Sequence, residues 1–157
     1  MESYEINDDT LAIVPKSENE SIVYETDNKY IVKESVDKIM EDSCLYFGSN
    51  FEGRKASSAR ILNLTHKLPI LVEESNQIIF FPTSSPRLAT CSWICLNNID
   101  HYEKLNNGTK VVFNDGQSLI LPMSYGMLDN QVLRSSRLQY LISARKGEKM
   151  GKKSKKN

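Results

Sequence analysis

Long apolar runs, paired cysteines and histidines are all scarce in this chain of 157 residues. The longest apolar runs, such as residues 78–81, are far too short to cross a bilayer, and the acidic start lacks the basic-then-apolar order of a secretory signal. The three cysteines are an odd number without the spacing of a disulfide framework, which favours a reducing compartment. We therefore expect a cytoplasmic protein with no membrane partner.

The residue patterns of common catalytic and metal sites are also missing. There are only two histidines, and no Gly-x-Ser-x-Gly nucleophile elbow or phosphate-binding glycine loop occurs. Cys91 and Cys95 lie four residues apart on a predicted strand, so their side chains would be about 13 Å apart, too far for one zinc ion. A zinc site that combines them with Cys44 and His66 would need a bulged strand. The sequence predicts no enzyme, no cofactor and no metal site.

The formal net charge of zero hides a strong gradient along the chain. Residues 1–43 carry twelve acids and four bases, residues 44–144 carry seven acids and nine bases, and residues 145–157 carry one acid and seven bases. Because screening at physiological salt limits each patch to about 8 Å, a polyanion would be attracted locally to the basic parts. The whole-chain charge therefore does not exclude a nucleic-acid partner.

Hydrophobic periodicity predicts an α+β domain at residues 1–146, in which a mostly antiparallel curved sheet or partial barrel carries one internal helix and one C-terminal helix. A pleckstrin-homology-like barrel is one candidate. The internal helix begins after the cap Ser35 and ends at Gly48, and the terminal helix runs from Ser124 to Gly147. The predicted strands are residues 11–14, 21–25, 30–32, 61–65, 69–72, 77–81, 91–99, 110–113 and 118–121.

Three segments between or after these elements have distinctive compositions. Asn114-Asp115-Gly116 is typical of a tight hairpin turn that needs positive φ. Residues 48–60 combine glycine, serine and bases with too few apolar side chains to bury a face, so we expect an exposed loop. Residues 147–157 are Lys-rich with almost no apolar residue, which predicts a disordered tail.

The loop at residues 53–60 has the composition of a phosphate-binding segment. Glycine and serine let backbone N–H groups approach phosphate oxygens, while arginine and lysine attract them. The candidate DNA contacts are Arg54, Lys55 and Arg60, with Lys67 and Arg87 as flanking positive charge. A merely solvated loop is the alternative that the residue types leave open. Arg134 and Arg137 could add a basic stripe on the last helix, where a solvated helix face is the alternative.

The chain also resembles a known family over roughly residues 2–140. The stretch from Cys44 reads CLYFGSNFEGRKASSARILNLTHKLPILVEESNQIIFFPTSSP, and it is followed by SWI at residues 92–94, LPMSY at residues 121–125 and NQV at residues 130–132. Together with the opening ESYEIN, these segments strongly resemble the ComK family of competence transcription factors.

The resemblance implies a transcriptional activator of the late DNA-uptake genes that also activates its own promoter. Family members bind A/T-rich double-stranded DNA boxes as dimers, with two dimers per promoter, through the minor groove, and they bend the DNA. This mode is physically coherent, because the minor groove distinguishes A·T from G·C pairs and narrow A-tract grooves attract arginine. It places the protein in the cytoplasm, at the nucleoid.

The end of the chain departs from the family pattern. Family members continue after the terminal helix through a segment by which a proteolytic adaptor captures the activator, and here a short Lys-rich tail stands in its place. This departure puts adaptor control in question. It also leaves a second function open, a truncated interaction module that does not bind DNA and dimerises with or modulates an intact relative.

Overall fold

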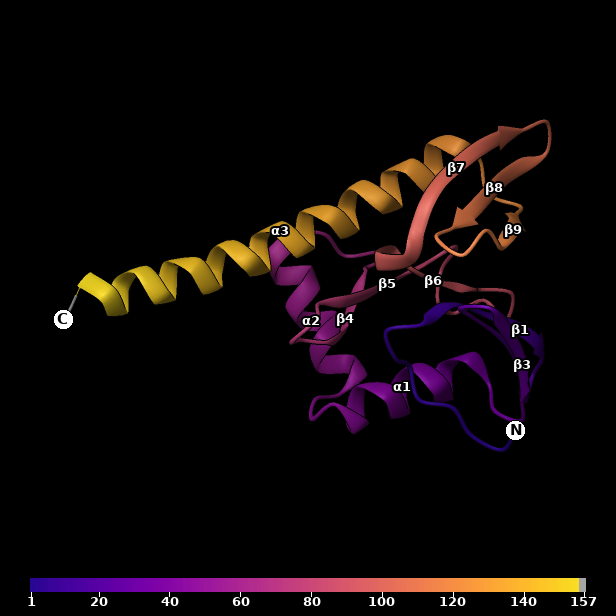
Figure 1. Cartoon of the computed structure of the whole chain (residues 1–157), viewed down its shortest axis with the longest axis horizontal. Coiled ribbons are helices and arrows are strands. Elements are labelled where there is room, and N and C mark those ends of the chain that lie inside the picture. The colour runs from indigo at the N-terminus through magenta and orange to yellow at the C-terminus, as the bar shows by residue number, and fades with distance from the viewer. Residues whose placement is uncertain (156–157) are drawn as a thin grey trace.

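The computed structural model describes residues 1–155, with side chains as far as residue 147, and shows two antiparallel sheets and three α-helices (Figure 1). The first sheet consists of β1 (Thr10–Ser17), β2 (Glu20–Glu25), β3 (Asn28–Val32), β4 (Ile70–Glu73), β5 (Ile78–Pro82) and β6 (Trp93–Cys95). The second consists of β7 (Ile99–Leu105), β8 (Gly108–Phe113) and β9 (Ser118–Leu121). The α-helices are α1 (Val36–Tyr46), α2 (Phe51–Leu62) and α3 (Tyr125–Lys155). The segment η1 (Leu96–Asn98) is a 3₁₀ turn.

The six-stranded sheet has the order β3-β2-β1-β6-β5-β4 and is buried on both faces in its centre. Successive residues of a strand point to opposite faces, so neighbours in the sequence enter different cores. Ile13 and Trp93 pack with α1 on one face, while Ala12 and Ile94 pack toward the three-stranded sheet on the other. This explains why the central strands are continuously apolar rather than alternating.

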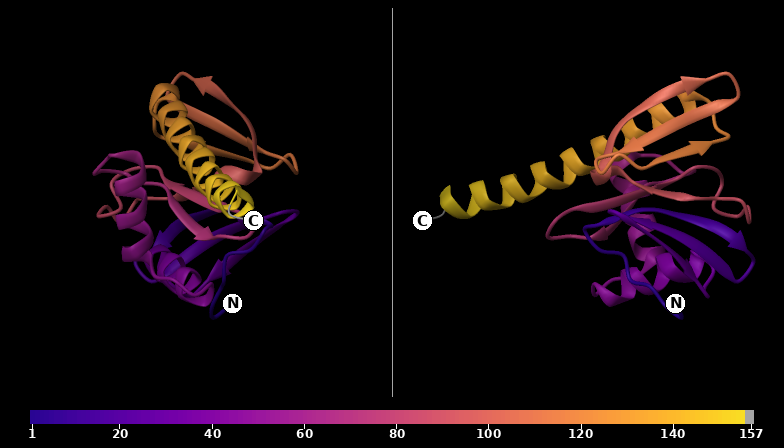
Figure 2. Two further views of the ribbon diagram at one scale, coloured as in Figure 1. Left: turned by 90° about the vertical axis from the view of Figure 1, so that its left-hand side faces the viewer. Right: turned by 45° about the vertical axis from the view of Figure 1, so that its right-hand side comes forward.

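The two sheets and the helices form layers (Figure 2). α1 covers one face of the six-stranded sheet, and the three-stranded sheet with the first turns of α3 covers the other. The later turns of α3 extend beyond the layered body (Figure 2). The predicted α+β class with a mostly antiparallel curved sheet is confirmed, whereas the barrel is wrong because the two sheets do not close on each other.

The first predicted helix is confirmed as α1. Ser35 caps it by accepting a hydrogen bond from the Lys38 amide at 3.1 Å, and Val36, Ile39 and Cys44 are buried on its inner face. The predicted hairpin is also confirmed, since Gly116 has φ of 91° and the Asp115 carboxylate accepts from the Gln117 amide. Both features depend on local capping and turn chemistry.

The predicted loop at residues 48–60 is wrong, because most of it forms α2, so the chain has two internal helices rather than one. The Asn50 side chain caps this helix by accepting from the Gly53 amide at 2.6 Å, and Asn63 ends it in the left-handed conformation with φ of 54°. Arginine, lysine and alanine are good helix formers, which offset the glycine and the serines. The predicted strand at residues 61–65 is wrong for the same reason, since Ile61 and Leu62 are the last residues of α2.

The predicted strand at residues 91–99 is divided into β6, the turn η1 and the start of β7. Two asparagine side chains hold this turn. Asn97 accepts from the Ile79 amide at 3.0 Å, and Asn98 donates to the Thr10 carbonyl at 2.9 Å. The turn carries the chain from the first sheet to the second, and the polar strand β7 was missed because few of its side chains are apolar.

The terminal helix begins as predicted, with Ser124 accepting a hydrogen bond from the Met127 amide at 3.2 Å. It continues to Lys155 rather than ending at Gly147. Lysine and glutamate favour helix propagation, and each of the two glycines in this stretch, Gly147 and Gly151, costs only about 1 kcal/mol once a helix is established. The division into a domain at residues 1–146 and a disordered tail at residues 147–157 stays a prediction.

Candidate nucleic-acid interface

α2 is attached to the six-stranded sheet by its first turn. The ring of Phe51 meets Trp93 of β6 edge to face, with ring centroids 5.7 Å apart, and Ser58 and Leu62 are buried on the same side of the helix. Trp93 is fully buried, so this contact fixes the rotation of α2. Lys55, one turn after Phe51, is thereby held beside the sheet.

Three of the predicted DNA contacts line one cavity of about 350 Å³. Lys55 comes from α2, Lys67 from the connection to β4, and Arg87 from the connection between β5 and β6. Phe51 and Trp93 form part of its wall, and its lining residues include no carboxylate. We call this cavity the basic groove. Its three cations are far apart in the sequence and are brought together by the sheet.

A buried amide fixes the backbone of Lys67. Gln131 of α3, only 3% exposed, donates through Nε2 to the Lys67 carbonyl at 3.1 Å and to the Pro82 carbonyl at 2.8 Å. Lys67 itself has φ of 50°, a left-handed conformation that non-glycine residues seldom adopt. Gln131 therefore ties the loop, the end of β5 and α3 together. The sequence analysis did not identify this role. The signal was that Gln131, a polar residue, stands at helical spacing from the apolar Leu128 and so faces the core.

A second, smaller hollow of about 80 Å³ continues the positive surface toward α3. Lys67 lines both hollows, and Arg134 lines the second and donates through Nη1 to the His66 carbonyl at 3.2 Å. We call Arg87, Lys55, Lys67 and Arg134 the basic strip. None of the four forms an ion pair with a residue that the structure describes, so their charges are uncompensated at close range.

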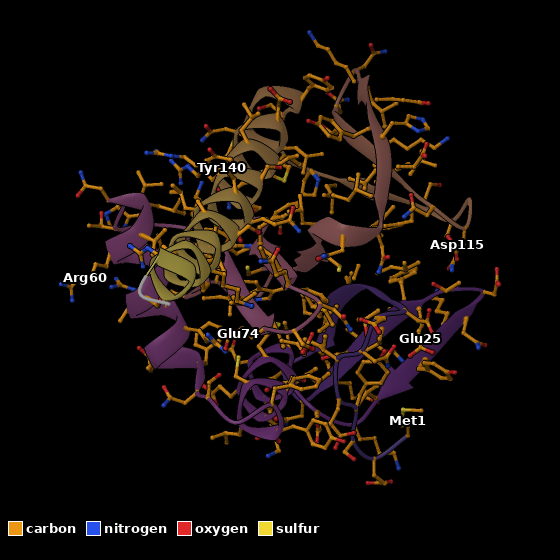
Figure 3. All side chains as sticks on the ribbon, turned by 60° about the vertical axis from the view of Figure 1, so that its left-hand side comes forward. Met1, Glu25, Arg60, Glu74, Asp115 and Tyr140 are labelled. Carbon is orange, nitrogen blue, oxygen red and sulfur yellow. The ribbon has the colours of Figure 1, made fainter. Side chains whose placement is uncertain are left out.

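The other two predicted contacts lie elsewhere on α2. Arg54 donates through Nε to the Ser49 hydroxyl at 3.0 Å, lies 3.9 Å from a Glu74 carboxylate oxygen, and has a side chain only 19% exposed. Arg60 is exposed on the outer side of the helix and points away from the body (Figure 3). The five predicted residues therefore do not form one cluster. Three share the basic groove, one supports the helix from its other flank, and one faces outward.

The thiols do not have the properties of nucleophiles or metal ligands. Burial raises the pKa of Cys44 to about 11 and that of Cys95 to about 12, so both remain protonated at neutral pH. In residues 1–147 no group of three or more His, Cys, Asp or Glu side chains is arranged to hold a metal ion. Within the same described region, no helix is both long and apolar enough to span a bilayer.

Comparison with known proteins identifies the class of the protein. The family model described as ComK protein matches residues 1–147. The competence transcription factor of Bacillus subtilis (strain 168) is 36% identical over 143 residues, which cover 88% of this chain and 74% of the relative. Comparison with solved structures finds no match.

The protein is thus a competence transcription regulator, which is not a class of enzyme. The chain belongs to the ComK family. The resemblance expected from the sequence is confirmed.

Proposed function

We propose that the chain activates late competence genes by binding A/T-rich promoter boxes through the minor groove. The observation that carries this proposal is the basic strip, in which four cations from separate segments line two adjoining hollows and form no ion pair with a described residue. A polyanion supplies the compensating charge that the strip lacks, because neutralising phosphates releases condensed counterions. Membership in a family of transcription factors supports DNA as this polyanion, and we propose that the protein works at the nucleoid.

Within the strip, the residues have different roles. Lys55 and Lys67 are point charges beside apolar walls, which suits contacts with phosphate oxygens. Arg87 is exposed on a loop that follows Pro86, so its guanidinium reaches the narrow minor groove of an A-tract. Arg60 lies outside the strip and adds positive charge on the outer side of α2. Arg54 acts as a positioning residue, because its hydrogen bond to Ser49 ties the first turn of α2 to the segment before it, while its 3.9 Å contact with Glu74 adds little.

We further propose that the chain binds DNA as a dimer or a dimer of dimers. α3 exposes two large apolar side chains seven residues apart, Leu133 at 60% and Tyr140 at 70% exposure. This is the heptad spacing that places side chains on one helix face for pairing with a second helix. A two-fold dimer would present two basic strips to paired half-sites.

A gel-shift titration at two salt concentrations tests the DNA proposal. The probe carries spaced A and T runs, and the competitor is a G/C-rich probe of the same length, because the minor groove distinguishes A·T from G·C pairs. We expect Lys67→Gln/Arg87→Gln to weaken binding and to reduce the slope of log K against log salt by about two. The matched control is Lys33→Gln, which removes an exposed charge that pairs with Glu2 in the acidic part of the chain.

Two outcomes contradict the proposal in different ways. If the control weakens binding as much as the double variant, the binding is charge attraction without a defined site. If the folded, dimeric wild type binds the A/T probe no better than the G/C-rich one, the chain is the interaction module that does not recognise DNA. Sedimentation of the same samples distinguishes that result from loss of folding.

A further inference from the structure

A larger cavity, of about 490 Å³, lies on the flank of α2 that faces away from the basic groove. Its apolar floor is formed by Ile61 of α2, Leu71 of β4 and Leu138 and Ile142 of α3. We call it the α2–α3 cavity. Its volume lies within the range of roughly 300–1,000 Å³ that is usual for small-molecule sites, and its lining comes from three elements that pack together around Leu71 and Leu138.

The rim of the α2–α3 cavity carries more positive than negative charge. Arg54, Arg145 and Lys146 line it, and Glu74 is the one carboxylate among its lining residues. Glu74 lies 3.9 Å from Arg54 and 3.9 Å from Lys146, which is the outer limit of an ion pair, so it compensates both only weakly. Figure 3 shows Glu74 beside α2 and α3. An added anion would find three cations around an apolar floor.

The cavity also offers a hydroxyl group. Ser58 lines the cavity, and the residue is only 2% exposed. Its hydroxyl forms no hydrogen bond with a residue that the structure describes, and its oxygen is not one of the fully buried polar atoms without a partner. A polar ligand group in the cavity would give this hydroxyl a hydrogen-bond partner.

We propose that the α2–α3 cavity binds a small amphiphilic carboxylate. The apolar chain of the ligand packs on Ile61, Leu71, Leu138 and Ile142, and its carboxylate lies among Arg145, Lys146 and Arg54. The excess of cations excludes a cationic amphiphile of the same length. This site is separate from the basic groove, so it does not depend on the proposed DNA binding.

Calorimetric titration of the full chain with decanoate, below its micelle concentration, tests the proposal. We expect saturable binding to one site, no binding of acetate, which lacks the apolar chain, and no binding of decylammonium, which has the opposite charge. Arg145→Gln/Lys146→Gln should weaken decanoate binding about 5- to 10-fold, the effect of losing two exposed ion-pair partners. Arg137→Gln, an exposed arginine of the same helix outside the cavity lining, is the matched control and should bind as the wild type does.

A second variant tests the cavity itself. Ser58→Leu fills the space at its floor and should remove saturable binding, with circular dichroism showing that the helices remain. If Ser58→Leu does not fold, the charge variant and its control still decide the question. Decanoate binding that is non-saturable, equal to that of decylammonium, or unchanged in Arg145→Gln/Lys146→Gln overturns the proposal, as does binding of an acidic peptide in place of decanoate.

Discussion

Among single residues, Glu34 has the least favourable environment of the described carboxylates. Its Oε2 is buried without a hydrogen-bond partner, and burial raises its pKa above the usual 4.5, opposed by the nearby charge of Lys38. The folded chain therefore binds a proton at Glu34 more tightly than the unfolded chain does. Its contribution to the free energy of unfolding is largest below pH 4.5 and is lost as the pH rises through the folded-state pKa.

We expect Glu34→Gln to stabilise the protein at pH 7, because the substitution removes the desolvation cost of the ionised carboxylate and nearly preserves the shape of the side chain. The midpoint of thermal unfolding should rise by about 2–4 °C, which corresponds to about 1 kcal/mol. The difference between variant and wild type should shrink as the pH is lowered to 4. Scanning calorimetry between pH 4 and 7.5 measures both quantities, and a difference that does not depend on pH would refute the explanation.

At the scale of elements, α2 connects the two sites that we propose. Lys55 on one flank enters the basic groove, while Arg54, Ser58 and Ile61 line the α2–α3 cavity on the other flank. The helix is short and contains a glycine, so its stability depends on its caps and on the contact between Phe51 and Trp93. A change at its N-terminus should therefore be visible in the stability of the whole chain.

We expect Asn50→Ala to lower the free energy of unfolding by about 1 kcal/mol, because it leaves the Gly53 amide without its side-chain acceptor. Asn50→Asp should retain most of the stability, since aspartate also accepts this hydrogen bond and its charge is favourable at a helix N-terminus. Urea unfolding followed by circular dichroism gives the comparison. Equal midpoints for Asn50→Ala and the wild type would show that the cap does not support α2.

At the scale of the whole molecule, the charge is unevenly distributed along the chain, and one helix projects from the layered body. The acidic residues 1–43 build β1 to β3 and α1, while α3 extends beyond the layered body on the side of α2 (Figures 1 and 2). Leu133 and Tyr140 are the most exposed large apolar residues of α3, at 60% and 70% exposure. This arrangement suits association of two chains through α3.

We expect Leu133→Ser/Tyr140→Ser to shift the protein from dimer to monomer in sedimentation velocity, because the substitutions remove the two largest exposed apolar side chains of this helix face. The affinity for a probe with two boxes should fall more than that for a single box, since only the dimer gains from linked half-sites. Lys33→Gln, an exposed position outside α3, serves as the control, because Arg137 lies between Leu133 and Tyr140 on the same helix face. A dimer that persists in the double variant places the interface elsewhere.

How far each feature could be predicted depends on whether its cause is local. The alternation of β2, the apolar run of β1, the cap at Ser35, the turn at Gly116 and the family resemblance can all be read from the sequence, so the class of the fold and of the protein followed from it. α2 was missed because its apolar side chains are few and its stability comes from Asn50 and from packing on Trp93.

The sequence alone determined which side chains are available to bind an anion. Residues 53–60 are rich in arginine and lysine, and basic residues recur at positions 67 and 87. Only the tertiary structure decided which of them act together. Arg54 and Lys55 are neighbours in the chain, yet a helix turns by about 100° per residue and so directs them to opposite flanks of α2. Lys67 and Arg87 are distant in the chain, yet the pairing of β4, β5 and β6 brings their loops to one groove.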